Sequence, residues 1–380
     1  MIDTAEQFSA MMARLRDEPR IGVDTESNGL YRYRERVCLI QISTADADYL
    51  VDPLAVDVRP LAEIFASSDI EKVFHAGEYD IGCLRRDFGF SFRRLFDTMV
   101  AARTLGLKRL GLAALVEEFA GVRLNKGMQQ SDWGRRPLSP EQLRYAALDS
   151  HYLLPLRDTL ASRLAESGRL RQAQECFEGL CNCEWHGRSF DPEDYLRLRA
   201  GPKLERVELA ILRELLIWRE AKARALDRPP FRVATNEMLI KVARMQPRSR
   251  EALRLMFRTR GGPVCRFADE VLAAVGRGLR LAQKGWQPPR RQARERVSRF
   301  ERCYMALQDW KELEAARLGL PPSEVVADTA LRRIAECMPR TMDDLAALGC
   351  VPVPSLETYG GTILDIVEAE HAGPGMKVQP

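Results

Sequence analysis

The chain has 380 residues, of which 46% are hydrophobic, and a formal net charge of +4 at neutral pH. This length allows more than one hydrophobic core, so we expect two or three domains, and the small net charge permits a nucleic-acid partner without requiring one. Charged residues among the first twenty exclude a secretory signal peptide, and no stretch approaches the roughly 20 apolar residues that span a bilayer. We therefore expect a cytoplasmic protein with no membrane partner.

From residue 20 to about residue 164 the sequence alternates short apolar runs with helical periodicity, a pattern typical of an α/β domain. Short turn segments separate the first three apolar runs, so the sheet should begin antiparallel. The last helix of this region opens with Ser139 as a cap and Pro140 in its first turn. The predicted strands are residues 21–26, 37–43, 48–51 and 72–75, and the predicted helices are residues 58–66, 79–88, 110–120 and 140–164.

The nine cysteines are scattered without the spacing of a disulfide framework, so we expect reduced thiols. Cys181, Cys183 and His186 form a compact C-x-C-x-x-H cluster of the kind that can bind zinc. A tetrahedral zinc site needs a fourth ligand, and no second Cys or His pair lies nearby in the sequence. The simpler interpretation is that the cluster holds no metal.

Beyond residue 200 the strand patterns nearly vanish, and the chain becomes helical and rich in Arg and Leu. A shift of 92 positions aligns Trp218 with Trp310 and the proline pair 229–230 with the pair 321–322. A single offset held by paired prolines and aromatics predicts a duplicated small helical domain. We expect domains at residues 1–170, 203–284 and 295–371, with residues 285–294 linking the two helical copies.

Four histidines are too few to dominate a metal site, so metal chemistry would rely on carboxylates, whose oxygens favour magnesium or manganese. Asp24 and Glu26 lie two positions apart at the end of a predicted strand, so both side chains project from one face. Two buried acids repel each other unless a cation compensates their charge. Exposed acids at a strand end are the alternative explanation of this pair.

Two further segments place acids beside apolar structure. Tyr145 and Asp149 lie four residues apart in a predicted helix and therefore share one face, although a core Tyr followed by a solvated Asp would give the same spacing. Residues 73–80 run from an apolar strand through small residues into a helix whose first turn carries Asp80. The helix dipole favours an acid at that position even without a metal, so capping is the alternative there.

Taken in order, these segments resemble the three exonuclease motifs of the DEDD superfamily, in its tyrosine-bearing branch. Asp24-Thr25-Glu26 matches the first motif, residues 75–80 match the second, and residues 145–149 match the third. The run NKGMQQSDWGRRPL at residues 125–138 resembles the ribonuclease D family within that superfamily, and the helical copies resemble the HRDC domain. The resemblance implies a ribonuclease H-like α/β exonuclease domain, with a mixed sheet flanked by helices, followed by two small all-α HRDC domains.

The resemblance also implies an activity. It implies a 3′-5′ exoribonuclease in which Asp24, Glu26, Asp80 and Asp149 hold two divalent ions, Mg²⁺ or Mn²⁺, and nucleoside 5′-monophosphates leave the RNA 3′ end. Tyr145 would orient the attacking water. Transfer RNA precursors are the substrates that the resemblance implies, and no obligate protein partner is evident. As a hypothesis, the helical copies hold the body of a structured RNA while the nuclease domain takes its end.

Contacts to the RNA are the least specific expectation. His75, Gln41, Lys126 and Trp133 are candidate RNA-binding residues, although core packing explains Trp133 equally well. Basic clusters that could attract phosphate, or could belong to solvated helix faces, occur at Lys126, Arg135 and Arg136 and at Arg290, Arg291, Arg294, Arg296 and Arg299.

Two other functions stay open at this point. A DNA 3′-5′ exonuclease would share the same four acids, although two HRDC-like copies favour the ribonuclease. A catalytically silent RNA-binding adaptor would have no reason to keep a cluster of repelling acids. Dinucleotide-binding and nucleoside-triphosphate-binding folds lack support, because neither G-x-G-x-x-G nor a P-loop follows a predicted strand.

Overall fold

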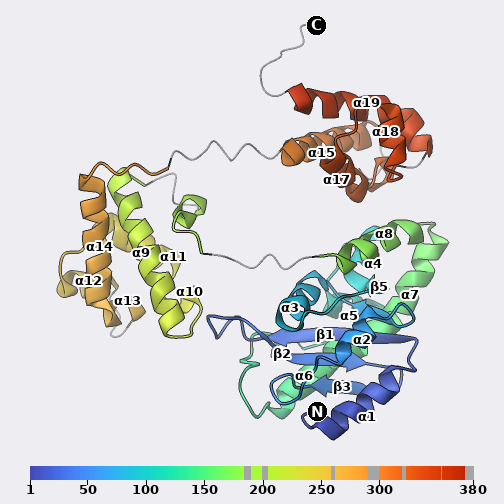
Figure 1. Ribbon diagram of the computed structural model, residues 1–380, viewed down its shortest axis with the longest axis horizontal. Coiled ribbons are helices and arrows are strands. Elements are labelled where there is room, and N and C mark those ends of the chain that lie inside the picture. Colours follow the sequence, from blue (N-terminus) through green and yellow to red (C-terminus); the bar gives the residue numbers. More distant parts are fainter. Residues whose placement is uncertain are drawn as a thin grey trace. The chain divides into compact units, whose positions relative to one another are not determined.

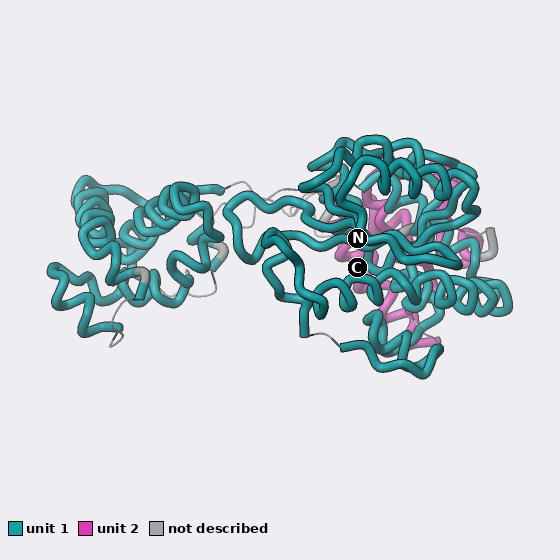
Figure 2. The backbone as a smooth tube through the Cα atoms, turned by 90° about the horizontal axis from the view of Figure 1, so that it is seen from below, with its two compact units in different colours: residues 1–288 teal, residues 289–380 magenta. Residues whose placement is uncertain are grey.

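The computed structural model describes residues 1–125, 127–183, 190–198, 204–257, 262–289, 299–318, 322–351 and 353–372. The chain divides into two compact units, Met1–Pro288 and Pro289–Pro380, which are coloured separately in Figure 2. The first unit contains the α/β domain and the first helical copy, and the second unit contains the second copy. Within the described ranges, none of the helices combines the length and the apolar character needed to cross a membrane.

The α/β domain is built on a five-stranded mixed sheet with strand order β3-β2-β1-β4-β5 (Figure 1). As predicted, the sheet begins antiparallel, because β1 pairs with β2 and β2 with β3 in that sense. The parallel half forms where β4 joins β1 and β5 joins β4. The strands are β1 (Arg20–Ser27), β2 (Val37–Ser43), β3 (Asp48–Val51), β4 (Glu71–Phe74) and β5 (Leu95–Asp97).

Helices cover both faces of this sheet. Alternation along β1 turns Ile21 and Val23 into one core and leaves Asp24 facing the other side. On the first face the core is shared with α1 (Ala5–Leu15), α2 (Leu61–Ala66) and α3 (Glu78–Phe88). The opposite face packs against α4 (Thr98–Thr104), α5 (Leu112–Ala120), α6 (Pro140–His151) and α7 (Leu153–Glu166), while α8 (Leu170–Cys181) packs along β5.

The single helix predicted over residues 140–164 is wrong, because the chain forms α6 and α7 there, separated at Tyr152. The start of α6 is as predicted, with the Ser139 hydroxyl accepting from the backbone of Gln142 in a capping box. Pro155 lies in the first turn of α7 and has no N–H to offer the carbonyl of His151, so the hydrogen-bond ladder is interrupted. The sequence pattern also missed β5, which has only three residues, and the helices α1, α4 and α8.

Gly22 controls how closely α6 and α7 approach β1. A Cβ atom at this position would lie 2.8 Å from the carbonyl oxygen of Ser150 and 3.2 Å from the Cβ atom of Leu153. The hydroxyls of Ser150 and Ser43 are 2.7 Å apart, which ties α6 to β2 as well. The missing side chain of Gly22 therefore lets α6 lie against the strand that carries Asp24.

The helical half contains two copies of one arrangement, each with its own apolar core. The helices α10, α11 and α12 begin 92 residues before α16, α17 and α18, which is the offset predicted from the sequence. The first copy consists of η1 (Asp194–Arg197), α9 (Arg206–Ala225), α10 (Pro230–Val233), α11 (Asn236–Met245), α12 (Arg250–Phe257), α13 (Pro263–Arg266) and α14 (Ala268–Gln283). The second consists of α15 (Arg299–Leu318), α16 (Pro322–Val325), α17 (Asp328–Cys337), α18 (Met342–Ala347) and α19 (Val353–Ala372).

Side-chain packing repeats with the same offset. Trp218 meets Phe267 edge-on at 6.5 Å, and Trp310 meets Tyr359 in the same T-shaped geometry at 5.6 Å. The predicted duplication is therefore present in the packing as well as in the sequence. The predicted linker, residues 285–294, lies partly outside the described residues.

Within the first unit, the loop between β1 and β2 contacts the first helical copy. The Tyr33 hydroxyl donates to Glu220, and the Tyr33 backbone N–H donates to Asp227 at 3.2 Å. From the next helix, Arg232 donates to the carbonyl oxygen of Leu30 at 2.6 Å. The same loop continues from the strand that carries Asp24, so the helical copy is connected to the edge of the nuclease domain that holds the acids.

Candidate active site

A cavity of about 340 Å³ opens where β1 and β4 end, on the face of the sheet covered by α6. Its walls come from segments far apart in sequence: the second half of β1, the turn after β4, the N-terminus of α5, the loop near Asn125 and Gln129, and α6. All three segments that the sequence singled out contribute to this region, since Asp24 and Glu26, His75, and Tyr145 and Asp149 line the cavity.

Three of the four predicted acids lie close enough to share one ion. Asp24, Glu26 and Asp149 each offer a carboxylate oxygen, and these atoms lie within 4.8 Å of one another. The first two share a face because they are two residues apart in β1. The third reaches them because Gly22 lets α6 approach that strand. Across the described ranges, no other group of three acid, His or Cys side chains comes this close together.

The electrostatics of this group favour an added cation. Burial raises the pKa of Asp24 well above its ordinary value, and the charges of Asp80, Asp149 and Glu26 raise it further. Burial, together with Asp149 and Asp80, raises the pKa of Glu26 to about 9, and burial raises the pKa of Asp149 to about 6. Ionising all three at neutral pH therefore requires a compensating positive charge. An all-oxygen donor set suits a hard divalent cation, so these residues fit the metal that the resemblance implies.

Asp80 occupies a different position from the other three acids. It lies in the first turn of α3, as predicted, and is buried, but its carboxylate accepts a hydrogen bond from the Thr25 hydroxyl. Thr25 points to the opposite face of β1 from Asp24 and Glu26, because side chains alternate along a strand. Burial raises the pKa of Asp80 to about 7, although the Thr25 bond lowers it. Asp80 is therefore not one of the three acids whose oxygens lie within 4.8 Å of one another, but its charge raises the pKa values of Asp24 and Glu26, so it lies close to the cluster.

Tyr145 lies beside the acids on the same helix face as Asp149. A hydrogen bond links its phenol to the Asp149 carboxylate. Burial and the charges of Asp149 and Glu26 raise the pKa of Tyr145 well above its ordinary value. The Trp133 ring packs against the phenol at a centroid distance of 6.0 Å. Tyr145 is therefore held as a neutral hydrogen-bond donor at the edge of the cavity.

Asp97, which sequence reasoning missed, holds the turn that presents His75. One oxygen accepts the backbone N–H groups of Ala76 at 3.2 Å and of Met99 at 2.9 Å, and the other accepts the N–H of Gly77 at 2.7 Å. Parallel pairing brings the carboxylate to the turn, since Asp97 lies opposite Phe74 in the ladder. The Asp97-Thr98 pair could have been recognised in the sequence as a helix cap. It gave no indication that Asp97 also accepts from the turn at Ala76 and Gly77.

His75 is fixed by the same turn. Its Nδ1 atom lies 2.9 Å from the Thr98 hydroxyl oxygen, and that hydroxyl donates to the carbonyl oxygen of Phe74 at 3.1 Å. Because the Thr98 proton is used for the carbonyl, Nδ1 must carry the hydrogen in this pair. The ring is thereby held in one tautomer at the cavity wall.

The remaining candidate RNA-binding residues lie elsewhere. Gln41 and Trp133 are 0% and 1% exposed and sit behind the cavity, in the layer between β2 and α6. Lys126 lies outside the described residues. Of these candidates, His75 lines the cavity, whereas Gln41 and Trp133 are buried and do not line it.

The basic clusters are described only in part. Arg136 donates to the buried carboxylate of Asp52 at 2.6 and 2.7 Å and to the carbonyl oxygen of Cys38 at 2.7 Å, so it braces its own loop. Arg135 is exposed. Outside the described residues lie Arg290, Arg291, Arg294, Arg296 and the side chain of Arg299.

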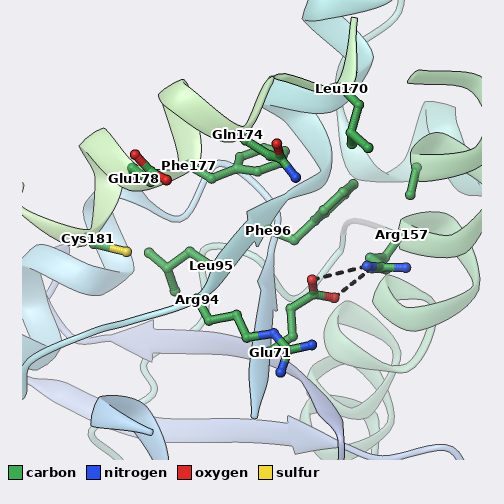
Figure 3. Close-up of a pocket in the computed structure, with 11 residues that line it drawn as sticks. Glu71, Arg94, Leu95, Phe96, Arg157, Leu170, Gln174, Phe177, Glu178 and Cys181 are labelled. Carbon is green, nitrogen blue, oxygen red and sulfur yellow. Dashed lines mark hydrogen bonds and ion pairs between the residues drawn. The ribbon is translucent and has the colours of Figure 1, made fainter. Parts of the chain in front are cut away.

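A second cavity, of about 390 Å³, lies between β5, α7 and α8 (Figure 3). Phe96 and Phe177 line it, and the Glu71 carboxylate pairs with Arg157 at 2.6 Å beside them. The Glu71 carboxylate is thus already compensated, unlike the acids of the first cavity. Cys181 of the C-x-C-x-x-H cluster also lines this cavity as a free thiol, while His186 lies outside the described residues.

Known proteins match both halves of the chain. A family model described as a 3′-5′ exonuclease matches residues 1–165, and a model of the HRDC domain matches residues 208–275 and 300–367. Ribonuclease D of Acidiphilium cryptum is 35% identical over 67% of this chain and 65% of its own length. The solved catalytic core of RRP6 from Trypanosoma brucei has a TM-score of 0.67 at 31% identity, over 74% of this chain and 79% of that one. The chain belongs to the ribonuclease D family.

Ribonuclease D of Escherichia coli, solved as an exoribonuclease involved in structured RNA processing, aligns over 98% of this chain and 97% of its own, with a TM-score of 0.63 and 26% identity. The predicted fold class is confirmed, since a mixed sheet flanked by helices precedes two helical HRDC regions. The predicted domain limits stay predictions. The chain spans only 35% and 29% of the length of two longer curated relatives.

Proposed function

We propose that this chain is a 3′-5′ exoribonuclease that releases nucleoside 5′-monophosphates from RNA ends by metal-dependent hydrolysis. The observation that carries the proposal is the buried cluster of Asp24, Glu26 and Asp149, in which oxygens from three carboxylates lie within 4.8 Å of one another. Membership of the ribonuclease D family supports the same activity. A silent adaptor would gain nothing from three buried acids whose charges repel.

In this proposal Asp24, Glu26, Asp80 and Asp149 hold two divalent ions, Mg²⁺ or Mn²⁺. When bound, such ions supply Lewis-acid activation of the phosphate and of the attacking water. Thr25 keeps the Asp80 carboxylate oriented through its hydroxyl hydrogen bond. Tyr145 orients the water as a neutral phenol rather than removing a proton itself, because its pKa is raised.

The substrate is proposed to be structured RNA, with transfer RNA precursors as the natural class, processed in the cytoplasm without an obligate protein partner. The cavity and the fixed imidazole of His75 would receive the terminal nucleotide. The helical copies would then contact the body of the RNA. The ribonuclease D family and the paired HRDC regions support RNA over DNA as the polymer.

Product analysis tests the proposal directly. A 5′-labelled RNA and a DNA strand of the same sequence are each incubated with the full chain in Mg²⁺, in Mn²⁺ and in EDTA. Stepwise shortening of the RNA from its 3′ end, with nucleoside 5′-monophosphate as the product and no reaction in EDTA, is expected. Equal digestion of the DNA would favour the DNA exonuclease, and binding without shortening in either metal would leave only the adaptor.

A further inference from the structure

Gln41 is a buried amide whose polar atoms have no partner among the described residues. Its side chain is 0% exposed, and neither Oε1 nor Nε2 makes a hydrogen bond there. A buried carboxamide without partners costs free energy, and such groups in folded proteins call for a specific explanation. The residue does not line the cavity itself, so direct contact with a substrate does not supply one.

The position of Gln41 in the sheet indicates what its amide serves. On one side its cross-strand neighbour is Leu50 of β3, and on the other it is Asp24 of β1. Side chains opposite each other in antiparallel strands share a face and have Cβ atoms about 4.5–5.5 Å apart. Leu50 has nothing to offer a carboxamide. Asp24 has a carboxylate within the reach of a glutamine side chain.

The helix α6 covers the face of β2 on which the Gln41 side chain lies. The Ser43–Ser150 hydroxyl contact fixes α6 over β2, and one turn earlier Ala146 packs in the same core as Leu39. Gln41 lies between Leu39 and Ser43 on this face of the strand. The amide is therefore confined between β2 and α6. Of its two cross-strand neighbours, Leu50 is apolar and Asp24 is polar.

We infer that Gln41 is a positioning residue for Asp24, and this inference rests on the proposed function. When Asp24 is ionised and holds metal, the carboxamide N–H of Gln41 donates a hydrogen bond to one carboxylate oxygen and leaves the other turned toward the ion. Groups behind metal ligands commonly act in this way, and replacing them weakens metal binding by about 10- to 100-fold. The bond also gives the buried Nε2 group a partner, which accounts for a glutamine at this position in a largely apolar layer.

Titration calorimetry of Mn²⁺ binding to the full chain, without RNA, tests the inference. Gln41→Met keeps the length of the side chain and removes the donor, and it should weaken Mn²⁺ binding by about tenfold or more. Ser43→Ala is the matched control, because Ser43 is equally buried on the same face of β2 and also contacts α6, but its cross-strand neighbours are Gly22 and Asp48, neither of which belongs to the acid cluster. Its Mn²⁺ affinity should stay within about twofold of the wild type, since it removes no donor to a metal ligand.

Unfolding in EDTA separates positioning from a structural role. Replacing an unpartnered amide by an apolar group of similar size should leave the metal-free stability equal or higher, whereas a purely structural glutamine would lose stability. Gln41→Leu serves as the second variant if Gln41→Met does not fold. Wild-type Mn²⁺ affinity in a folded Gln41 variant would overturn the inference.

The two proposals fail in different ways. If the wild-type chain binds no Mn²⁺ and shortens no RNA, the proposed function fails. If the wild type binds the ion and trims RNA, but the Gln41 variants bind Mn²⁺ as tightly, only the role of Gln41 is lost.

Discussion

The carboxylates of the nuclease cavity and those of the helical copies are held in opposite ways. In the cavity, burial raises the pKa values of Asp24, Glu26 and Asp149, and neighbouring acids raise those of Asp24 and Glu26 further. In the helical copies, hydrogen bonds from Arg250 and Arg317 lower the pKa values of Asp269 and Glu314. Among the described residues that line the cavity there is no Lys or Arg, whereas Asp269 and Glu314 each pair with an arginine.

This difference teaches where an added cation and an added polyanion can be accommodated. A bound metal would relieve repulsion in the cavity, whereas Asp269 and Glu314 of the helical copies are already paired with arginines. Conversely, part of the basic surface of the first copy is already engaged, since Glu214 accepts from both Arg213 at 3.0 Å and Arg277 at 2.9 Å. Fewer arginines of the first copy are therefore available to a phosphate group than their number indicates.

The largest expected effect comes from removing one acid of the cavity. Asp149→Asn or Asp24→Asn should reduce nucleotide release by at least about a hundredfold while the fold stays intact, because a ligand charge is lost without its volume. Asp269→Asn is the control acid from the helical copies and should trim RNA like the wild type. Single-turnover trimming and circular dichroism measure the two outcomes, and near wild-type trimming by Asp149→Asn in Mg²⁺ would contradict the assignment.

Removing the phenol should have the next largest effect. Tyr145→Phe should lower turnover by about a hundredfold with little change in RNA affinity, because a hydrogen bond to the water and to Asp149 is lost while the ring remains. Tyr152→Phe, at the end of the same helix and away from the cavity, is the control. Weak RNA binding with unchanged turnover would instead make Tyr145 a substrate contact.

The raised pKa values predict how metal binding depends on pH. Because burial raises the pKa of Glu26 to about 9, the metal-free folded chain holds a proton there that the unfolded chain would already have lost. Rising pH therefore destabilises the metal-free protein between pH 4.5, the ordinary pKa of Glu26, and about pH 9. Over the same range it favours the ionised form that binds metal. The Mn²⁺ concentration for half-maximal trimming should fall by about tenfold per pH unit for each proton displaced.

Kinetics at pH 6 to 9 and denaturation in EDTA over the same range check both parts of this prediction. Glu26→Gln should make metal-free stability depend less steeply on pH, because one of the buried acids that titrate has been removed. A metal requirement that does not change with pH would show that the acids are ionised before the cation arrives.

The smallest expected effect concerns the second helical copy. Truncation after Pro288 removes the second compact unit and leaves the first with its own cores. Trimming of a structured RNA should weaken by roughly tenfold through lost avidity, whereas a short single strand should be trimmed about as fast as before. Equal loss on both substrates would argue that the copy acts on the nuclease unit rather than on the RNA.

Several parts of this architecture were readable from residue patterns alone. Alternation predicted β1 to β4 and placed Asp24 and Glu26 on one face, and a helical spacing placed Tyr145 with Asp149. The 92-residue offset predicted the duplicated helical copies. These features depend on neighbours in sequence, and local periodicity records them.

Other features escaped prediction because they depend on pairing between distant segments. β5 has three residues, too few for a pattern, yet its pairing with β4 brings Asp97 to the turn that carries His75. Asp80 looked equivalent to the other acids in sequence, but it bonds Thr25 and is not among the three acids whose oxygens meet. The break between α6 and α7 was foreseeable from Pro155, whereas the close approach at Gly22 was not.

The candidate catalytic residues, the α/β domain that carries them and the two helical copies could all be predicted from the amino-acid sequence. Each produces a pattern in the spacing of residues close together in the chain. Residue spacing did not reveal that the carboxylates of Asp24, Glu26 and Asp149 meet. It also did not reveal that Asp80 bonds Thr25, or that the buried Gln41 lies opposite Asp24 in the sheet. The physical reason is that strand register and helix packing, which fix these distances, are set by contacts between residues far apart in the chain.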